Sequence, residues 1–184
     1  EIVDSLVGSE MCIRDSSGVW PTPSGKIEIY SQQMAELGLD PMPVHVPEVE
    51  GLSGVSESSP YPLQVFSAAT HYFIGSTFQH VEHLQNMLSR PTFELSPQDA
   101  NKRSIDEGDF CRLFNDRGEV FGHAHIVEGM RPGVLGAPKQ LQGSKMKNGF
   151  NLNALTSQKE ADMGRGPVYY STLAEIQKVD VSPA

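Results

Sequence analysis

The sequence predicts a mostly β (α+β) fold, a small barrel of strands with short helices, and three observations lead to this class. Residues 93–120 hold a strand, a capped helical turn, a second strand, a tight turn and a third strand in close succession. The 184 residues include 13 Pro and 17 Gly, which favour a fold with many turns. Further short apolar runs flank this segment, and none approaches the ~20 residues of a membrane helix.

Residues 17–60 are predicted to form an extended linker that precedes the barrel. A strand is expected at 27–30, and Ser31 is positioned to cap a short helix over 32–37, which Gly38 would end. Residues 40–60 are rich in Pro and Gly and favour an irregular chain. The compact domain is therefore expected to cover residues 61–180.

The first part of the domain is predicted as a strand over 62–68, a polar loop over 70–79 and a short helix over 80–88. Ser96 and Pro97 then start a helix, because a hydroxyl caps free N–H groups and Pro suits the first helical position. Asp99 falls in the first turn, where the helix dipole favours an anion. After a second strand, residues 115–118 (NDRG) have the composition of a hairpin turn.

In the second part, residues 120–127 alternate between Val120, Gly122, Ala124 and Ile126 on one side and Phe121, His123, His125 and Val127 on the other, as expected for a strand exposed to two different environments. A short strand is predicted at 134–137 and an irregular loop at 139–153. We expect a helix over 157–163 that Gly164 closes, and a closing strand over 168–179. On that strand Tyr169 and Tyr170 would point to opposite faces.

Composition and charge exclude several classes of function. The formal net charge is −9, which argues against nucleic acid as a partner because phosphate binding needs a basic surface. Cys12 and Cys111 are too few for a disulfide framework or a Cys-based metal site. The pairs His80/His83 and His123/His125 lack an evident third metal ligand. Cys111 is predicted to be a small buried hydrophobic residue.

The beginning of the sequence differs in character from the rest. Residues 5–16 (SLVGSEMCIRDS) resemble the in-frame translation of a sequencing adapter, so residues 1–16 are interpreted as an artefact and left out of fold reasoning. On this interpretation the natural start is missing, together with any targeting signal. Cytoplasm and periplasm both stay open.

Four segments in order resemble one protein family. They are 22–31 (TPSGKIEIYS), 70–78 (THYFIGSTF), 95–118 (LSPQDANKRSIDEGDFCRLFNDRG) and 153–166 (NALTSQKEADMGRG). Each is weak alone, but the ordered set resembles the C-terminal dinucleotide-binding domain of molybdopterin-guanine-dinucleotide oxidoreductases, the dimethyl-sulfoxide-reductase superfamily. The resemblance implies a six-stranded double-psi β-barrel.

The resemblance also implies what the chain does and what accompanies it. The domain would bind a bis-(molybdopterin guanine dinucleotide) cofactor of molybdenum or tungsten for two-electron redox or oxygen-atom-transfer chemistry. The metal ligand and a 4Fe-4S cluster would lie in upstream domains of the same enzyme, and an iron–sulfur electron-transfer subunit would be a further partner. The chain would then be a C-terminal fragment that is inactive alone.

Hydroxyls, amides and close backbone approach are what a dinucleotide requires of a binding loop, and two segments supply them. Within the resemblance, the candidate cofactor-binding residues are Thr70, His71, Gly75, Ser76, Thr77, Lys139, Asn153, Thr156 and Tyr170. No residue is assigned a catalytic role, and no protein residue is assigned to a metal. The turn at 115–118 is interpreted as scaffold.

Two other functions remain open at this point. One is a stand-alone double-psi barrel that acts as a non-enzymatic binding module; the linker motif at 22–31 argues against it, because such a module has no use for it. The other is a self-processing decarboxylase of the same barrel class, for which Gly75-Ser76 is the one candidate cleavage site. Self-cleavage on a denaturing gel would distinguish the latter.

Overall fold

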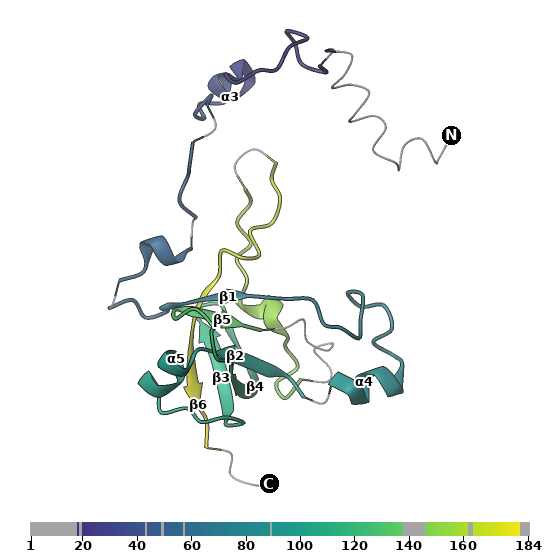
Figure 1. Cartoon of the computed structure of the whole chain (residues 1–184), viewed down its shortest axis with the longest axis vertical. Helices are drawn as coiled ribbons and strands as arrows, with labels where there is room; N and C mark the ends of the chain where they lie inside the picture. Colours follow the sequence, from purple (N-terminus) through teal and green to yellow (C-terminus); the bar gives the residue numbers. More distant parts are fainter. Residues whose placement is uncertain are drawn as a thin grey trace. The chain divides into compact units, whose positions relative to one another are not determined.

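Six strands close into a barrel within the residues that the computed structural model describes, which are 18, 20–42, 44–48, 50–56, 58–88, 90–137, 146–161 and 164–180. The strands, shown in Figure 1, are β1 (Leu63–Phe66), β2 (Thr92–Leu95), β3 (Phe110–Asn115), β4 (Gly118–Ile126), β5 (Val134–Gly136) and β6 (Leu173–Lys178). Their order around the barrel is β1-β5-β2-β4-β3-β6.

The barrel combines two parallel strand pairs with four antiparallel pairs. β1 runs parallel to β5, and β2 runs parallel to β4. The pairs β3–β4, β3–β6, β1–β6 and β2–β5 are antiparallel. Full closure leaves no exposed sheet edge. The predicted mostly β, six-stranded double-psi barrel is confirmed.

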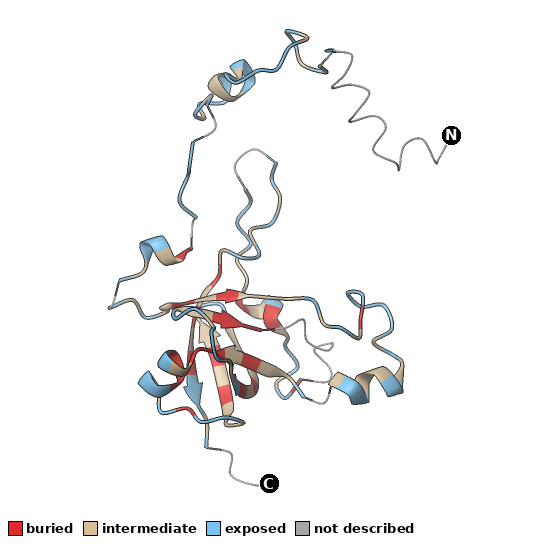
Figure 2. Cartoon of the chain, in the orientation of Figure 1, coloured by how far each residue is buried: buried red, intermediate tan, exposed pale blue. Residues whose placement is uncertain are grey.

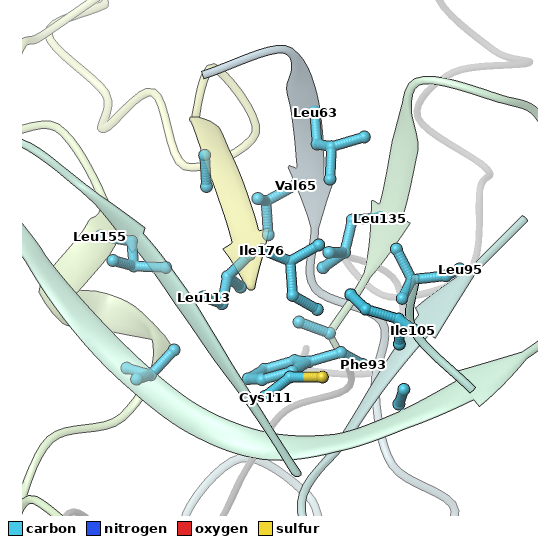
Figure 3. Packing of buried hydrophobic residues seen from close by; sticks show 14 of the residues in the cluster. Leu63, Val65, Phe93, Leu95, Ile105, Cys111, Leu113, Leu135, Leu155 and Ile176 are labelled. Carbon is cyan, nitrogen blue, oxygen red and sulfur yellow. The ribbon is translucent and has the colours of Figure 1, made fainter. Parts of the chain in front are cut away.

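The barrel interior is filled by alternate residues of each strand, as the two-residue period of a strand requires. Figure 3 shows the side chains of this cluster meeting at the centre, and Figure 2 shows the buried positions concentrated on the strands. The largest is Phe93, whose ring needs a glycine opposite it: a Cβ at Gly122 would lie 3.1 Å from the ring. Cys111 is fully buried in this cluster, as predicted.

Helix α5 (Pro97–Lys102) confirms the predicted capped turn and adds a buried contact. The Ser96 Oγ accepts a hydrogen bond from Asp99 N at 3.0 Å and donates one to Asp99 Oδ2 at 2.6 Å. Asp99 Oδ2 also accepts from the backbone N–H of Gly133 at 2.8 Å. Because Gly133 directly precedes β5, this carboxylate ties the helix to the start of a barrel strand.

Four other short helical segments occur within the described residues. They are α3 (Gln32–Glu36), α4 (Glu82–Leu88) and the 3-10 turns η1 (Leu52–Gly54) and η3 (Leu152–Leu155). The Ser31 side chain accepts from Met34 N, so the predicted N-cap of α3 is confirmed. None of the helices within the described residues has the length and apolar character needed to span a membrane.

Three local predictions were wrong. Residues 27–30 are irregular, with a bend at 29–30, and do not form a strand; Ile27 and Ile29 are exposed, and no strand among the described residues pairs with this segment. Residues 157–161 are not helical; the helical turn lies earlier, as η3, because Leu152 and Leu155 are the apolar pair that reaches the core.

The closing strand is the third correction. β6 begins at Leu173 rather than at 168. Tyr169 and Tyr170 therefore lie in the turn before it, and they are 61% and 60% exposed, so neither packs as a strand residue would.

Contacts divide the chain into two units, Glu1–Val46 and Pro47–Ala184. The described part of the first unit holds α3, whose start is fixed by a hydrogen bond from Ser31 N to Pro41 O at 2.8 Å. The second unit holds the barrel together with residues 47–60. Glu50 joins that stretch to the barrel through an ion pair with Arg117.

Candidate dinucleotide-binding site

The loop between β1 and α4 carries five of the predicted site residues. Ile74 and Thr77 form an isolated antiparallel bridge, and Gly75 between them has a φ of 60°, a value that favours glycine. The Thr70 Oγ1 accepts from Phe73 N at 3.2 Å, so this hydroxyl stabilises the loop itself. The four remaining predicted residues of the loop are exposed: His71, Gly75, Ser76 and Thr77.

Gln79 is a residue of this loop that the sequence did not single out. Its Nε2 donates to Gly75 O at 2.9 Å, which fixes the orientation of the amide. Its Oε1 is buried and accepts no hydrogen bond from any residue that the structure describes. Its neighbour Phe78 has a φ of 70°, which is unfavourable for a bulky side chain. A buried acceptor without a donor is costly, so a ligand that brings an N–H group would relieve it.

The second predicted loop contains η3 and its C-cap. The Asn151 side chain accepts from Asn153 N at 3.1 Å, and the Thr156 Oγ1 donates to Asn153 O at 2.9 Å. Leu152 and Leu155 anchor the turn in the core. The Asn153 side chain is exposed and makes no hydrogen bond with the described residues, so its amide can both donate and accept toward a ligand.

Side chains of the β3–β4 hairpin donate hydrogen bonds to the η3 turn. Leu155 O accepts from Asn115 Nδ2 at 3.0 Å and from Arg117 Nε at 2.7 Å. The same Asn115 amide donates to Leu173 O at 3.0 Å. The sequence predicted this hairpin only as a turn, and it gave no signal for these contacts because the partners are 38 to 58 residues away along the chain.

Glu50 completes this network from the stretch that enters the barrel. Its two oxygens accept from Arg117 Nη1 and Nη2 at 2.7 and 2.8 Å, a bidentate pair. Glu50 Oε2 also lies 3.4 Å from Leu173 N. The hydrogen bond from Arg117 is the main reason that the pKa of Glu50 lies below its usual range, although partial burial opposes the shift.

A shallow depression of about 310 Å³ lies at the same hairpin, lined by residues 112 and 114–119. Its charged side chains already have partners: Arg112 pairs with Glu119 at 3.2 Å, and Asp116 accepts from Tyr61 Oη at 2.6 Å. Because Arg117 is engaged by Glu50 as well, both arginines that line the depression are already paired within the described residues, whereas Asp116 has only the neutral Tyr61 hydroxyl as its partner.

The barrel topology relates some of the predicted residues and separates others. Phe66 at the end of β1 pairs with Gly136 at the end of β5, and Ala137 N donates to Phe66 O at 2.8 Å. Phe66 and Ala137 thus lie side by side where β1 and β5 end. Lys139, two residues after Ala137, lies outside the described residues. No hydrogen bond between described residues joins 67–80 to 146–161.

Tyr170 lies apart from the Thr70 loop. Its carbonyl accepts from Gln64 Nε2 at 3.3 Å, which places it beside the first half of β1 and not at the end where the Thr70 loop begins. Its ring is exposed. The premise that Tyr169 and Tyr170 point to opposite faces of a strand was wrong, whereas the contact of Tyr170 with a cofactor stays a prediction.

The described residues contain no group of three or more His, Cys, Asp or Glu that is arranged to hold a metal ion. His123 Nδ1 contacts Gly108 O at 3.1 Å, and His125 Nδ1 contacts Glu107 at 3.1 Å, so both rings have structural partners. The site is therefore one of hydroxyls, amides and backbone groups. It suits a ligand with both hydrogen-bond donors and acceptors, such as a pterin or purine ring with a diphosphate.

Fold and loops together define a ligand-binding double-psi barrel, and comparison with known proteins gives the family. The family described as "Molydopterin dinucleotide binding domain" matches residues 63–173, and the chain belongs to it. The resemblance that the motifs indicated is thereby confirmed.

Named relatives agree with this family. Dimethyl sulfoxide reductase DmsA of Escherichia coli (strain K12) is 34% identical over 172 residues, which cover 86% of this chain and 21% of the relative. Probable oxidoreductase YoaE of Bacillus subtilis (strain 168) is 33% identical over 165 residues, covering 88% and 23%. The chain thus spans about a fifth of the length of these relatives.

A solved structure supports the fold independently. Acetylene hydratase from Pelobacter acetylenicus superposes with a TM-score of 0.72 over 86% of this chain and 24% of that chain. The sequence identity is 20%, so the likeness concerns the fold alone.

Proposed function

We propose that this chain is part of a bis-(molybdopterin guanine dinucleotide) oxidoreductase of molybdenum or tungsten, and that its barrel binds the dinucleotide of that cofactor. The observation that carries the proposal is the family match over residues 63–173. The loop after β1 is compatible with it, since Gln79 Oε1 is a buried acceptor that lacks a donor from the described residues. The N–H groups of a pterin or guanine ring would satisfy it.

The proposed roles follow from the chemistry of each side chain. Ser76 and Thr77 hydroxyls donate to diphosphate oxygens, and Gly75 lets the backbone approach them closely. His71 and Thr70 complete that loop. Asn153 and Thr156 bind a ring edge from the second loop, because an amide both donates and accepts. Lys139 supplies a cation and Tyr170 an apolar ring.

The cofactor itself supplies the redox chemistry when bound, and the residues of this chain position it and shield it from water. The relatives are named as reductases of dimethyl sulfoxide and, at 30% identity, of trimethylamine N-oxide. We therefore infer two-electron or oxygen-atom-transfer chemistry for the whole enzyme. Small S-oxides or N-oxides are the favoured substrates.

The rest of the enzyme is part of the same proposal. Residues 17–60 connect the dinucleotide-binding domain at 61–180 to upstream domains, which would hold the metal ligand and a 4Fe-4S cluster. An iron–sulfur electron-transfer subunit would take or deliver the electrons. Residues 1–16 are assigned to adapter sequence. The shares of 21% and 23% of the relatives' lengths support further domains in the whole enzyme.

The test is the cofactor content of the complete gene product, purified from a host that makes the cofactor. Metal analysis should find molybdenum or tungsten, and acid hydrolysis should release about two GMP per metal ion, as a bis-dinucleotide requires. Asn153→Ala should lower both contents together, whereas Asn101→Ala, on the exposed face of α5, should leave them unchanged. Protein that carries neither metal nor GMP would favour a non-enzymatic binding module instead.

A further inference from the structure

The backbone of the proposed Asn153 loop is fixed by two hydrogen bonds to one carbonyl oxygen, that of Leu155. Leu155 O lies between Asn153 and Thr156 and accepts from two side chains of the β3–β4 hairpin, Asn115 and Arg117. A carbonyl that accepts two hydrogen bonds has both lone pairs used. The loop therefore has little freedom to rotate about this point.

The hairpin also packs closely against the backbone of η3 at Gly118. A Cβ at Gly118 would lie 3.1 Å from Ala154 O, so only a glycine allows this packing without displacement. The hairpin thus supports the backbone side of the turn, while the Asn153 side chain is left exposed. Support on one side and an open polar group on the other is the arrangement that pre-organises a binding loop.

Arg117 supports the loop without being available to a ligand. Its Nε donates to Leu155 O, and its Nη1 and Nη2 donate to the two oxygens of Glu50. All three guanidinium nitrogens are therefore engaged. A phosphate would have to break the bidentate pair to reach the side chain, so a direct role in anion binding is disfavoured.

Glu50 determines the direction of the guanidinium. The bidentate pair fixes the plane of the Arg117 side chain, and Glu50 is itself fixed by Leu173 N at the start of β6. The stretch that enters the barrel is thus connected, through one ion pair, to the loop that carries Asn153. The sequence separation of 67 between Glu50 and Arg117 makes this a contact of the folded domain alone.

We propose that Arg117, oriented by Glu50, is a positioning residue for the dinucleotide loop around Asn153 and Thr156. This inference rests on the proposed function for its consequence, which is tighter cofactor binding. Its structural part, the ordering of the loop, stands independently. The NDRG turn is therefore a support for the binding site, and neither a plain turn nor a ligand contact.

The test compares Arg117→Lys and Glu50→Gln with the control Arg112→Lys in the 184-residue chain. Lysine cannot reproduce three engaged nitrogens, and glutamine loses the charge but keeps one acceptor. Arg112 is on the same hairpin and also pairs with a glutamate, Glu119, but it makes no hydrogen bond to residues 151–156 among the described residues.

Two readouts are measured on each folded variant. Hydrogen exchange at the amide of Thr156, which donates to Asn153 O, reports on loop order. Titration with GDP and with neopterin, as soluble stand-ins for the nucleotide and pterin ends, reports on binding. We expect Arg117→Lys to speed exchange and to weaken the tighter probe about tenfold, with a smaller effect for Glu50→Gln and less than twofold for Arg112→Lys.

The outcomes separate the two proposals. Unchanged exchange and unchanged affinity in Arg117→Lys would overturn the positioning role. If the unaltered chain binds neither probe, the proposed function is contradicted, while the exchange rates still decide whether Arg117 orders the loop. If Arg117→Lys fails to fold, the same two measurements on Glu50→Gln, which leaves the arginine in place, decide whether Arg117 has the positioning role.

Discussion

Replacement of Asp99 by alanine should destabilise the barrel more than any exposed acidic substitution. Asp99 is 3% exposed and lies in the first turn of α5. Its carboxylate accepts from Ser96 Oγ at 2.6 Å and from Gly133 N at 2.8 Å, and Arg103 Nη1 lies 3.6 Å away. One side chain therefore joins the helix cap, the entry to β5 and a cation.

The size of the effect follows from the groups that Asp99→Ala leaves behind. The partly buried Gly133 N–H loses its acceptor, at about 1–3 kcal/mol for a donor shielded from water. The Ser96 hydroxyl loses an acceptor too, but it still caps the helix. Arg103 keeps its bidentate contact with Glu175 at 2.5 and 3.2 Å, so its charge stays paired. The expected loss of unfolding free energy is about 3 kcal/mol.

Asp99→Asn provides a graded comparison. The amide keeps one oxygen for Gly133 N but turns an acceptor near Arg103 into a donor, so about 1–2 kcal/mol should be lost. Asp106→Ala is the control, because Asp106 is exposed, and it should stay within about 0.5 kcal/mol of the original chain.

Urea unfolding followed by circular dichroism measures all three variants at neutral pH. The slope of free energy against urea should not change, since the barrel buries the same surface. The reasoning is refuted if Asp99→Ala costs less than about 1 kcal/mol, or if Asp106→Ala costs as much.

Three further predictions concern pH, thiol chemistry and the binding loop. Arg117 lowers the pKa of Glu50, so the stability that this pair adds is complete above about pH 4.5 and is lost as pH falls through the lowered pKa. The difference in unfolding free energy between the original chain and Glu50→Gln, measured with urea, should therefore shrink at about pH 3. A difference that stays constant with pH would contradict this. Burial raises the pKa of Cys111 to about 11, so in Cys12→Ser the native chain should react with iodoacetamide at pH 8 about 100-fold more slowly than the unfolded chain, and equal rates would disprove the burial. Gln79→Leu removes the buried acceptor, so the free energy of unfolding should change by less than about 1 kcal/mol. The affinity for GDP or neopterin should fall; an unchanged affinity would show that Gln79 is not part of the binding site.

Local chemistry made most of the barrel predictable from sequence. Ser96 and Pro97 define the start of α5 through neighbours only, and the hairpin turn at 115–118 follows from its composition. The alternation along β4 was visible because Val120, Gly122 and Ala124 face the core. These signals act within a few residues, where single-sequence reasoning is strongest.

The errors arose where distant contacts decide the structure. The helical turn lies at η3 and not over the described residues 157–161, because Leu152 and Leu155 pack in the core, which no local propensity reveals. Tyr169 and Tyr170 have the β propensity of a strand, yet the pairing of β6 with β1 extends back only to Leu173.

The candidate site shows the same division. The two polar loops were predicted from residue type, and the structure describes one after β1 and one around η3. The roles of Gln79, Glu50 and Arg117 were not predicted. They depend on burial and on partners far away in sequence, such as the Glu50–Arg117 pair.

The most direct test of the central claim, that the polar loops of this barrel bind the dinucleotide, is a hydrogen-exchange comparison. The complete enzyme would be measured with its cofactor and after purification from a host that cannot make the cofactor. We predict slower exchange with cofactor at residues 70–79 and 153–156, and unchanged exchange in α5. Equal exchange in both loops with the cofactor bound would contradict the account.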